Sequence, residues 1–389
     1  MRIGIEGRYV APGGSGIPRY ARNLMRAYLT LGTEDELIAF HTDRWSKLNL
    51  DDLPEALPPM HPLQPTMKTK TIGLVKRHII HPMFRSATFF RGYSYVSRKA
   101  FDWLASSVKV DLFHALNFMP PDHVRAPTIP VVYDCSHIRH PETHPVARVR
   151  DMARLPQFLD RAPVVQTISE FSKREIMQVF GIPADRIGVV VPGISDIFMS
   201  APTTRLETIS KLGLKDGSFF LCVGTLEPRK NLKTVLEAHR SLPNQLRQDF
   251  PLVLVGGGGW GKASEWSMSH AERSLGLVRS TGYISDEQVR DLYSACRAFL
   301  FPSVYEGYGL PVREALAAGA PTVISEAEVL NEAAEGYATI LPTLDPSGWS
   351  AYMLAAIDTA PVRTVLAPPT WEDAAWRLAD LYRTASNQI

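Results

Sequence analysis

The stretch Phe301-Pro-Ser-Val-Tyr-Glu-Gly-Tyr-Gly-Leu-Pro-Val-Arg-Glu-Ala-Leu-Ala-Ala-Gly-Ala-Pro-Thr-Val-Ile324 has the pattern of a strand end, a loop and a helix. It continues an apolar run of strand length at residues 298–301, and its helix is predicted to begin at Pro311 and to stop at Gly319. Glu306 then lies on the loop, and Glu314 lies in the first turn of the helix, where a carboxylate suits the positive end of the dipole. Because open α/β sheets bind ligands beyond the carboxyl ends of their strands, both carboxylates are predicted to face a ligand. The alternative is a capped helix with one exposed glutamate.

The loop after the run at residues 219–224 is predicted to bring two cations to the same edge of the sheet. Its sequence, Gly224-Thr-Leu-Glu-Pro-Arg-Lys-Asn231, places Arg229 and Lys230 directly before a helix. Two cations and a helix N-terminus can converge on one anion. A departing diphosphate needs this positive charge if no metal supplies it. Taken alone, the loop also fits a solvated Arg-Lys pair at a helix entrance.

Strand-like apolar runs alternate with helical patterns along the whole chain. This alternation is typical of parallel, doubly wound sheets, and 389 residues are enough for two α/β domains. The polar stretch at residues 200–217 is the predicted linker. The runs lie at residues 3–9, 111–116, 129–134, 163–169 and 187–192 in the first half, and at 219–224, 251–256, 278–283, 298–301 and 321–324 in the second.

A glycine-rich turn, Gly13-Gly-Ser-Gly16, separates the first predicted strand from a helix at residues 18–31. Such a turn can bring backbone N–H groups against a phosphate, although turn glycines are also common without a ligand. The spacing differs from the Gly-x-Gly-x-x-Gly fingerprint of dinucleotide-binding proteins. A dehydrogenase is therefore disfavoured.

The overall charge is close to neutral, with 42 basic and 40 acidic side chains and a formal net charge of +2. This balance argues against a nucleic-acid-binding protein held by overall charge. The three cysteines, Cys135, Cys222 and Cys296, are too far apart for a metal motif or a disulfide framework, which favours a reducing cytoplasm. The first residues lack the apolar core of a signal peptide, and no apolar run reaches the length of a membrane span. We therefore expect a cytoplasmic protein, either soluble or peripheral to a membrane.

Residues 56–101 contain no Asp or Glu, and their basic side chains are interleaved with aliphatic and aromatic ones. This pattern suits an anionic membrane surface, here the inner face of the plasma membrane. The alternative is a helix pair with a solvated basic face and a buried apolar face. Nucleic acid would attract the same charges, but no other part of the chain resembles a nucleic-acid module. The basic residues are Lys68, Lys70, Lys76, Arg77, Arg85, Arg91, Arg98 and Lys99.

Three histidines, His137, His140 and His144, follow the predicted strand that ends at Asp134. Their spacing could place metal ligands on one face of a helix. Prolines at 141 and 145 make a regular helix unfavourable here, and a metal site is not expected. A polar loop that contacts substrate is the favoured interpretation, and a merely exposed loop is the alternative.

The spacing Glu306-Gly-Tyr-Gly-Leu-Pro-Val-Arg-Glu314 resembles the Glu-x7-Glu signature of retaining GT-B glycosyltransferases of family 4. The resemblance covers nearly the whole chain. It implies an α/β fold of the GT-B type, with two facing Rossmann-like domains built on parallel sheets. Residues 1–195 would bind the acceptor, 196–365 the nucleotide sugar, and a helix within 366–389 would cross back onto the first domain. Other segments in the family's order are residues 13–16 with Arg19-Tyr20, 167–173, 224–231, 281–286, 302–303 and 331–334.

The resemblance also implies roles for single residues. Glu314 would bind the nucleotide ribose, while Glu306 would hold the transferred sugar and Lys230 the phosphates. Two positions depart from the family's pattern. Thr225 stands where many members have an arginine, which leaves Arg229 as the substitute, and Tyr133 stands where many have the histidine of His-Asp, which leaves Tyr133 or His137 to take its place. The candidate residues are Glu306, Arg229, Lys230 and His137 for catalysis; Gly14, Gly16, Gly224, Thr225, Gly307, Tyr308, Gly309, Leu310 and Glu314 for the donor; and Tyr133, Asp134 and His137 for the acceptor.

The run from Tyr133 to Arg139, followed by Pro141-Glu-Thr-His-Pro145, is similar to mannosyltransferases that build bacterial exopolysaccharide or O-antigen units on a lipid carrier. The resemblance implies metal-independent transfer of a hexose, with GDP-mannose as the favoured donor and a lipid-diphosphate-linked saccharide as the acceptor. No cofactor is expected, and the chain contains no Asp-x-Asp motif. A UDP-sugar donor is the alternative on the same scaffold. A non-catalytic nucleotide-sugar-binding subunit of a transferase complex is the alternative from another class.

Overall fold

The protein, seen in a computed structural model, is described over residues 1–11, 16–41, 44–53, 108–121, 124–259 and 268–389. Its packing divides into two compact units. Unit 1 comprises Met1–Val131, Phe158–Val165 and Leu378–Ile389, and unit 2 comprises Val132–Gln157 and Gln166–Arg377. The predicted domains are continuous segments with boundaries at residues 195 and 365, whereas each of these units combines separate segments of the chain. The predicted boundaries stay a prediction.

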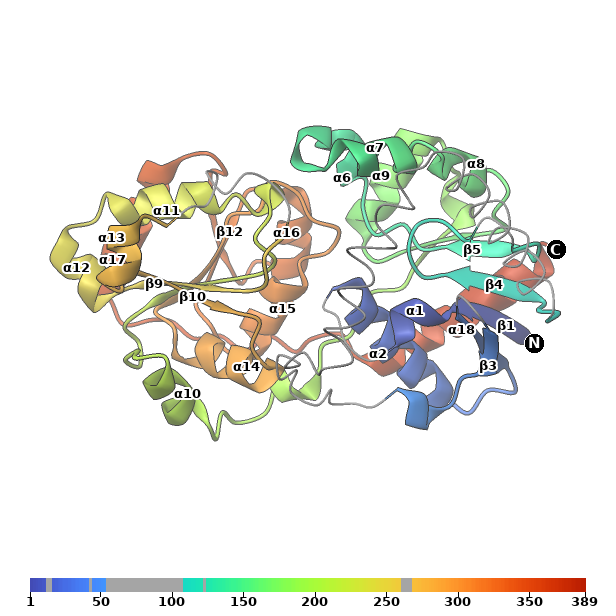
Figure 1. Ribbon diagram of the computed structural model, residues 1–389, viewed down its shortest axis with the longest axis horizontal. Coiled ribbons are helices and arrows are strands. Elements are labelled where there is room, and N and C mark those ends of the chain that lie inside the picture. Colours follow the sequence, from blue (N-terminus) through green and yellow to red (C-terminus); the bar gives the residue numbers. More distant parts are fainter. Residues whose placement is uncertain (12–15, 42–43, 54–107, 122–123, 260–267) are drawn as a thin grey trace, which may run out of the picture. The chain divides into compact units, whose positions relative to one another are not determined.

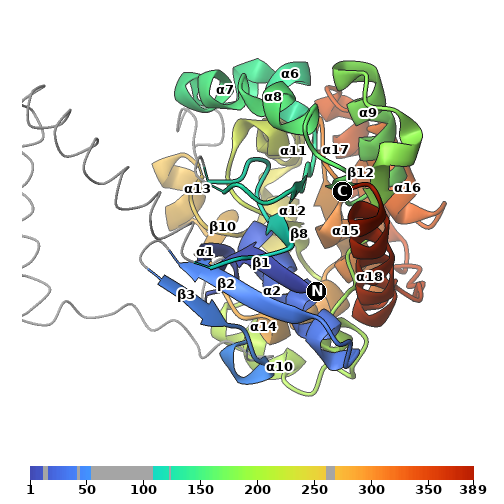
Figure 2. The ribbon, with the colours of Figure 1, turned by 90° about the vertical axis from the view of Figure 1, so that its right-hand side faces the viewer.

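The sheet of unit 1 has the strand order β3-β2-β1-β4-β5, of which β3, β2 and β1 are labelled in Figure 2. All neighbouring strands are parallel except β3, which is antiparallel to β2. The predicted strand at residues 3–9 is too long, because β1 ends at Glu6 and a short helix begins at Gly7. Gly7 lets the chain turn close to His41, since a Cβ at Gly7 would lie 2.7 Å from the His41 Nδ1 atom. The elements are β1 (Arg2–Glu6), α1 (Gly7–Val10), α2 (Ile17–Thr30), β2 (Glu36–His41), β3 (Arg44–Lys47), a 3-10 turn at Leu50–Asp52, β4 (Leu112–Ala115) and β5 (Thr128–Pro130).

The C-terminal helix α18, Trp371–Asn387, returns to unit 1 with its last residues. Thr370 lies immediately before its first residue, and the Thr370 hydroxyl accepts a hydrogen bond from the Asp373 backbone N–H at 3.0 Å. Tyr382 is fully buried, with its ring edge-on to that of Tyr28 at 5.3 Å between centroids. The Tyr382 hydroxyl also lies 2.7 Å from Nδ1 of His114 on β4. The predicted return of the last helix to the N-terminal part of the chain is confirmed.

Unit 2 contains a six-stranded parallel sheet in the order β10-β9-β8-β11-β12-β13. Alternate side chains pack against α11 and α17 on one face and against α14, α15 and α16 on the other (Figure 1). Burial on both faces explains why β8, β9 and β11 are short, continuous apolar runs, and the five predicted strands are confirmed. The elements are β8 (Phe220–Val223), α11 (Leu232–Arg240), α12 (Asn244–Asp249), β9 (Leu252–Val255), α13 (His270–Ser274), β10 (Val278–Gly282), α14 (Asp286–Ala295), β11 (Ala298–Phe301), α15 (Leu310–Ala317), β12 (Thr322–Ser325), α16 (Glu328–Ala334), β13 (Thr339–Leu341) and α17 (Pro346–Asp358).

One prediction about the middle of the chain is confirmed and one is wrong. The predicted strands at residues 163–169 and 187–192 are found as β6 and β7, which pair with each other in a two-stranded sheet. The predicted linker at 200–217 contains the helix α10, where the hydroxyls of Thr204 and Thr208 donate to Asp291 at 2.6 and 2.7 Å. The elements are α6 (Ser136–Arg139), α7 (Val146–Met152), α8 (Leu155–Leu159), β6 (Val165–Thr167), α9 (Glu170–Phe180), β7 (Ile187–Val189) and α10 (Arg205–Lys211), with 3-10 turns at Pro141–Thr143, Ala184–Arg186, Asp196–Phe198 and Pro228–Lys230.

Candidate active site

The loop between β8 and α11 delivers the two predicted cations. Gly224 leaves β8 with φ 146°, a backbone conformation that favours glycine, and a Cβ there would lie 3.4 Å from Cε of Lys230. The 3-10 turn Pro228–Lys230 then carries both cationic side chains. Asn231 follows in the left-handed conformation, and its side-chain amide donates to the Pro302 carbonyl oxygen at 3.1 Å. The cation loop is therefore fastened to the loop that follows β11.

The loop between β11 and α15 carries Glu306 and needs its glycines for two different reasons. Gly309 has φ 95°, and a Cβ there would lie 3.1 Å from Leu330. Gly307 approaches the backbone of Tyr133 so closely that a Cβ would lie 2.3 Å from the Tyr133 carbonyl oxygen. The Gly307 carbonyl oxygen accepts hydrogen bonds from the hydroxyls of Ser169 and Ser172, at 2.6 and 3.0 Å. These contacts fix the peptide next to Glu306.

Glu306 binds both cations directly. Its Oε1 accepts a hydrogen bond from Nζ of Lys230 at 2.6 Å, and its Oε2 lies 2.7 Å from NH1 of Arg229. Arg229 also pairs with Glu227 at 2.6 Å and donates to the Tyr305 carbonyl oxygen at 2.6 Å. All four charged side chains are largely buried, and two cations are balanced by two carboxylates. The sequence predicts cations that converge on an anion, and in this structure the anion is Glu306.

The electrostatics keep this cluster ionised. Burial alone would raise the pKa of Glu306, but the charges and hydrogen bonds of Arg229 and Lys230 lower it to about 2. Burial alone would lower the pKa of Arg229, but Glu306 and Glu227 raise it above its ordinary value. A buried ion pair that loses one partner leaves an uncompensated charge, which costs about 3–5 kcal/mol. The cluster is therefore expected to hold its charges until another charged group replaces one of them.

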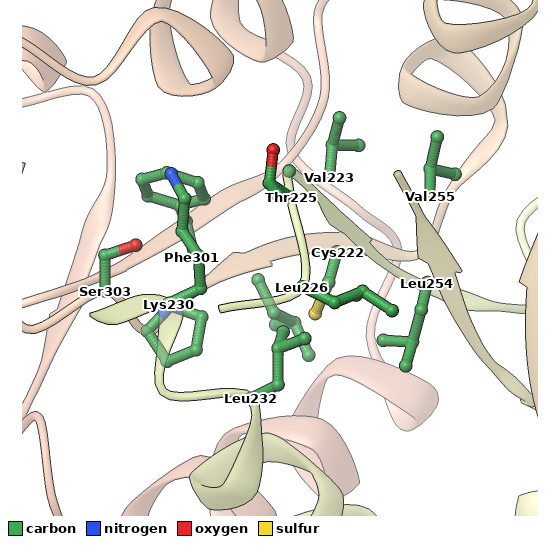
Figure 3. A pocket seen from close by; sticks show the side chains of 13 residues that line it. Cys222, Val223, Thr225, Leu226, Lys230, Leu232, Leu254, Val255, Phe301 and Ser303 are labelled. Atoms are coloured by element: carbon green, nitrogen blue, oxygen red, sulfur yellow. The ribbon is translucent and has the colours of Figure 1, made fainter. Parts of the chain in front are cut away.

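A small pocket lies beside Lys230 at the carboxyl ends of β8, β9 and β11. Its lining includes two predicted donor-binding residues, Gly224 and Thr225, and one predicted catalytic residue, Lys230. Figure 3 shows Lys230 next to Phe301 on one side of the pocket, and the Lys230 amine lies 4.7 Å from the Phe301 ring centroid. Most of the other lining residues are apolar. The Lys230 amine is held by the face of the Phe301 ring and by its ion pair with Glu306. The structure thus brings the β8 loop and the β11 loop together, as predicted.

Glu314 lies on the same helix that begins at the β11 loop. The helix α15 starts at Leu310, one residue before the predicted start, because Gly309 already turns the chain. Glu314 is therefore just past the first turn, not within it as predicted. The glutamate is only 5% exposed. Its predicted contact with a ribose stays a prediction.

The peptide after Val132 packs against Gly307 within unit 2 and contains a chain of hydrogen bonds. Asp134 Oδ1 accepts from the Ser136 hydroxyl at 2.6 Å, and the Ser136 Oγ lies 2.9 Å from Nε2 of His144. The Ser136 hydroxyl has one proton, which Asp134 accepts, so His144 Nε2 donates in the second bond. Burial lowers the pKa of His144, Asp134 raises it, and the charges of Arg148 and, less strongly, Arg229 lower it. The sequence pattern, which is interrupted by prolines, did not indicate this chain of hydrogen bonds.

His137, the predicted substitute for the family's histidine, has different surroundings. Its ring stacks on Phe180 of α9, with centroids 6.4 Å apart, and the residue is 5% exposed. Burial lowers the pKa of His137 to about 4, against a weaker raising effect of Asp134, so the ring is neutral at pH 7. The Tyr133 side chain is also buried, and its carbonyl oxygen lies 3.0 Å from the Ser172 Oγ, sharing that hydroxyl with the Gly307 carbonyl oxygen. The acceptor-binding roles of Tyr133, Asp134 and His137 stay predictions.

Two predicted features fall wholly or partly outside the described residues. Gly14 is one of them, whereas Gly16 is described, in unit 1, with φ 64° immediately before α2. The basic segment at residues 56–101 also lies outside the described part of the chain. In the described part, no three His, Cys, Asp or Glu side chains gather as a metal site would. None of the described helices is both long and apolar enough to cross a membrane.

Comparison with known proteins connects this arrangement to one family. The family named Glycosyltransferase Family 4 matches residues 14–196, and the family named Glycosyl transferases group 1 matches residues 205–363. The O-antigen chain mannosyltransferase B of Escherichia coli is 30% identical over 347 residues, which cover 88% of this chain and 87% of that protein. The chain belongs to glycosyltransferase family 4. As a member of this family, it is a hexosyltransferase that uses a nucleotide-sugar donor.

More distant relatives agree with this assignment and show the fold. The serotype-specific mannosyltransferase WbdA of Escherichia coli is 27% identical over 74% of this chain, a match that spans 36% of WbdA. The structure of WaaG, a glycosyltransferase involved in lipopolysaccharide biosynthesis, aligns with a TM-score of 0.61 at 17% identity, covering 100% of this chain and 98% of WaaG. Anabaena HepE in complex with UDP and glucose aligns with a TM-score of 0.59 at 16% identity, covering 100% and 95%. The predicted GT-B fold is confirmed.

Proposed function

We propose that this family 4 member is a retaining hexosyltransferase that moves mannose from GDP-mannose to a hydroxyl of a lipid-diphosphate-linked saccharide. The setting would be bacterial exopolysaccharide or O-antigen assembly. The observation that carries the proposal is the buried cluster of Lys230, Arg229 and Glu306 at the carboxyl ends of β8 and β11. The similarity to an O-antigen chain mannosyltransferase supports the choice of mannose and of this acceptor class.

The cluster suggests how the donor would be bound. A diphosphate offers Lys230 and Arg229 the negative charge that Glu306 supplies in this structure. When the diphosphate replaces the carboxylate next to Lys230, Glu306 becomes available to accept hydrogen bonds from hydroxyls of the sugar. The two cations and nearby helix N-termini would then stabilise the charge that develops as the diphosphate departs, while the acceptor hydroxyl attacks from the same face. The proposed reaction therefore takes its positive charge from side chains and needs no metal.

A donor screen with the purified full chain tests the proposal. We expect GDP-mannose to raise the melting temperature, because a ligand that binds only the native state stabilises it by mass action. The same protein should release GDP from GDP-mannose faster in the presence of a lipid-linked saccharide acceptor. UDP-glucose and UDP-N-acetylglucosamine are tested in the same way as comparison donors. A shift and turnover with a UDP-sugar alone would move the assignment to a UDP-dependent transferase, and binding without turnover of any donor would support the non-catalytic subunit.

Association with an anionic membrane is the second part of the proposal, and it rests on the basic segment of the sequence. We expect the protein to float with vesicles that contain phosphatidylglycerol and to be released by high salt, because surface attraction is screened. Replacing Lys68, Lys70, Lys76 and Arg77 by Gln should abolish flotation. Lys211 and Lys233, which are exposed side chains of unit 2, provide a control when both are replaced by Gln. Equal flotation of the segment variant and the control would remove the membrane from the proposal.

A further inference from the structure

Unit 1 has its own topological switch point, and polar side chains gather there. In the sheet order β3-β2-β1-β4-β5, the chain passes from β1 to one side through β2, and β4 lies on the other side of β1. Glu6 is the last residue of β1, and Asn117 follows the last residue of β4 by two positions. Open α/β sheets bind ligands at this place, beyond the carboxyl ends of the two strands where the order reverses.

Glu6 and Asn117 each present a buried oxygen atom without a hydrogen-bond partner in the described part of the structure. Glu6 is 2% exposed, and its Oε1 accepts from NH2 of Arg8 at 3.0 Å. Its Oε2 has no partner at hydrogen-bond distance among the described residues, although the backbone N–H groups of Asn117 and Leu116 act on the carboxyl group. The Asn117 amide nitrogen donates to the Tyr9 hydroxyl, but the Asn117 Oδ1 atom is likewise buried without a donor from any described group. Native proteins leave few such atoms, because each costs about 1–3 kcal/mol.

The chemistry of these atoms selects the class of ligand. Asn117 Oδ1 is an acceptor, and Glu6 Oε2 is one in the ionised form of the carboxylate, so the ligand must bring hydrogen-bond donors. The Glu6 carboxylate would repel an anionic ligand, and the Arg8 guanidinium would repel a cationic one. A neutral ligand that carries hydrogen-bond donors therefore fits best. Arg8 is 64% exposed and lies over the Tyr9 ring at 4.7 Å from its centroid, which gives the group a flat rim. Hydroxyl groups on a ring, as in a saccharide, match this pattern.

The burial of Glu6 has an electrostatic consequence that agrees with an incomplete site. Desolvation raises the pKa of Glu6 to about 7, although the charge and hydrogen bond of Arg8 and the backbone N–H groups of Asn117 and Leu116 oppose the shift. A carboxyl group with this pKa is close to losing its proton under neutral conditions. A hydroxyl that donates to Oε2 would favour the ionised form and offset part of the cost of burial.

We propose that Glu6 and Asn117, at the carboxyl ends of β1 and β4, bind the hydroxyl groups of a saccharide, with Arg8 and Tyr9 at the rim. This inference deepens the proposed function, since the acceptor proposed above is a saccharide. It assigns the acceptor side to atoms of unit 1 that the sequence analysis did not single out. It does not depend on the identity of the nucleotide.

The test uses saturation-transfer NMR on the full chain with methyl α-D-mannopyranoside and methyl β-D-glucopyranoside as probes. We expect the wild-type protein to bind at least one probe, and Glu6→Leu and Asn117→Ala to weaken that binding at least about tenfold. Glu36→Leu is the matched control, because Glu36 is an exposed carboxylate at the opposite end of the same sheet, paired with Arg2. The control should bind as the wild type does. If Glu6→Leu does not fold, Asn117→Ala decides alone.

Thermal shifts with GDP-mannose, recorded on the same samples, separate this inference from the proposed function. Glycoside binding that depends on Glu6 and Asn117, with no response to any nucleotide sugar, would support this inference and overturn the proposed transferase. A response to GDP-mannose with no glycoside signal, or with a glycoside signal equal in the wild type and both variants, would overturn this inference and leave the transferase standing.

Discussion

Replacing Glu306 by Gln or Lys230 by Ala is expected to lower the rate of sugar transfer by about 10²–10³-fold, the range for loss of one preorganised charge or donor. The two side chains are joined at 2.6 Å and are 9% and 12% exposed, so each interaction is made in a largely desolvated place. Lys230→Ala removes a charge proposed to stabilise the departing diphosphate. Glu306→Gln removes the carboxylate proposed to hold the transferred sugar. The measurement is kcat for GDP release in the presence of acceptor.

The binding of GDP should separate the two variants, because their charges change in opposite directions. Glu306→Gln leaves Lys230 without its carboxylate, so GDP meets a less neutralised site and should bind at least as tightly as to the wild type. Lys230→Ala leaves Glu306 with Arg229 only, so the local charge becomes more negative and GDP should bind more weakly. Isothermal titration with GDP measures both. A variant that loses transfer while gaining affinity for GDP cannot be explained by unfolding.

Lys233→Ala is the matched control for the cation loop. Lys233 lies on the first turn of α11, three residues after Lys230, and is 66% exposed in a weak pair with Glu237. It should keep the wild-type rate, because an exposed ion pair contributes about 0–1 kcal/mol and lies outside the cluster. Transfer at the wild-type rate in either Glu306→Gln or Lys230→Ala would contradict the assignment of these residues to the reaction.

The local parts of the site were predictable because they depend on short patterns. Four-residue apolar runs predicted β8, β9 and β11, since strands buried on both faces need such runs. Gly309 and the helix formers after it gave the start of α15 to within one residue. The loop that carries Arg229 and Lys230 followed from its place between a strand and a helix. Each of these features involves neighbours in sequence, where periodicity and turn residues carry information.

The contacts that close the site were not predictable, because they join residues far apart in the chain. Glu306 and Lys230 are 76 positions apart, and no local pattern shows that the carboxylate neutralises the cations in this structure. The same holds for α10. Its polar sequence resembled a linker, but the hydroxyls of Thr204 and Thr208 donate to the buried Asp291, which lies more than 80 positions away in the chain. β13 was missed because its residues are largely exposed. For Glu6 the sequence shows only an acidic residue at the end of an apolar strand. This pattern does not distinguish a buried carboxylate from one that is solvated at the strand end.

Replacing Gly307 by Ala is expected to lower both the melting temperature and the transfer rate, more strongly than a surface glycine would. A Cβ at Gly307 would lie 2.3 Å from the Tyr133 carbonyl oxygen, well inside van der Waals contact. Neither backbone can retreat freely, because the Ser172 hydroxyl binds the carbonyl oxygens of both Tyr133 and Gly307 at 3.0 Å. Overpacking of this kind costs about 1–3 kcal/mol. The shift needed to relieve it would displace the adjacent Glu306 from its two cations.

Gly257→Ala separates this effect from the general loss of a glycine in a loop. Gly257 also follows a strand of the unit 2 sheet, yet a Cβ there would meet no atom within 4 Å, and its φ is not left-handed. It should therefore keep the wild-type melting temperature in a thermal melt and the wild-type rate in the transfer assay. If Gly307→Ala matches Gly257→Ala in both measurements, the close approach of Gly307 to Tyr133 does not hold in solution. If Gly307→Ala melts at a lower temperature but transfers sugar at the wild-type rate, the position of Glu306 does not depend on that approach, and the carboxylate must be oriented by Lys230 and Arg229 alone.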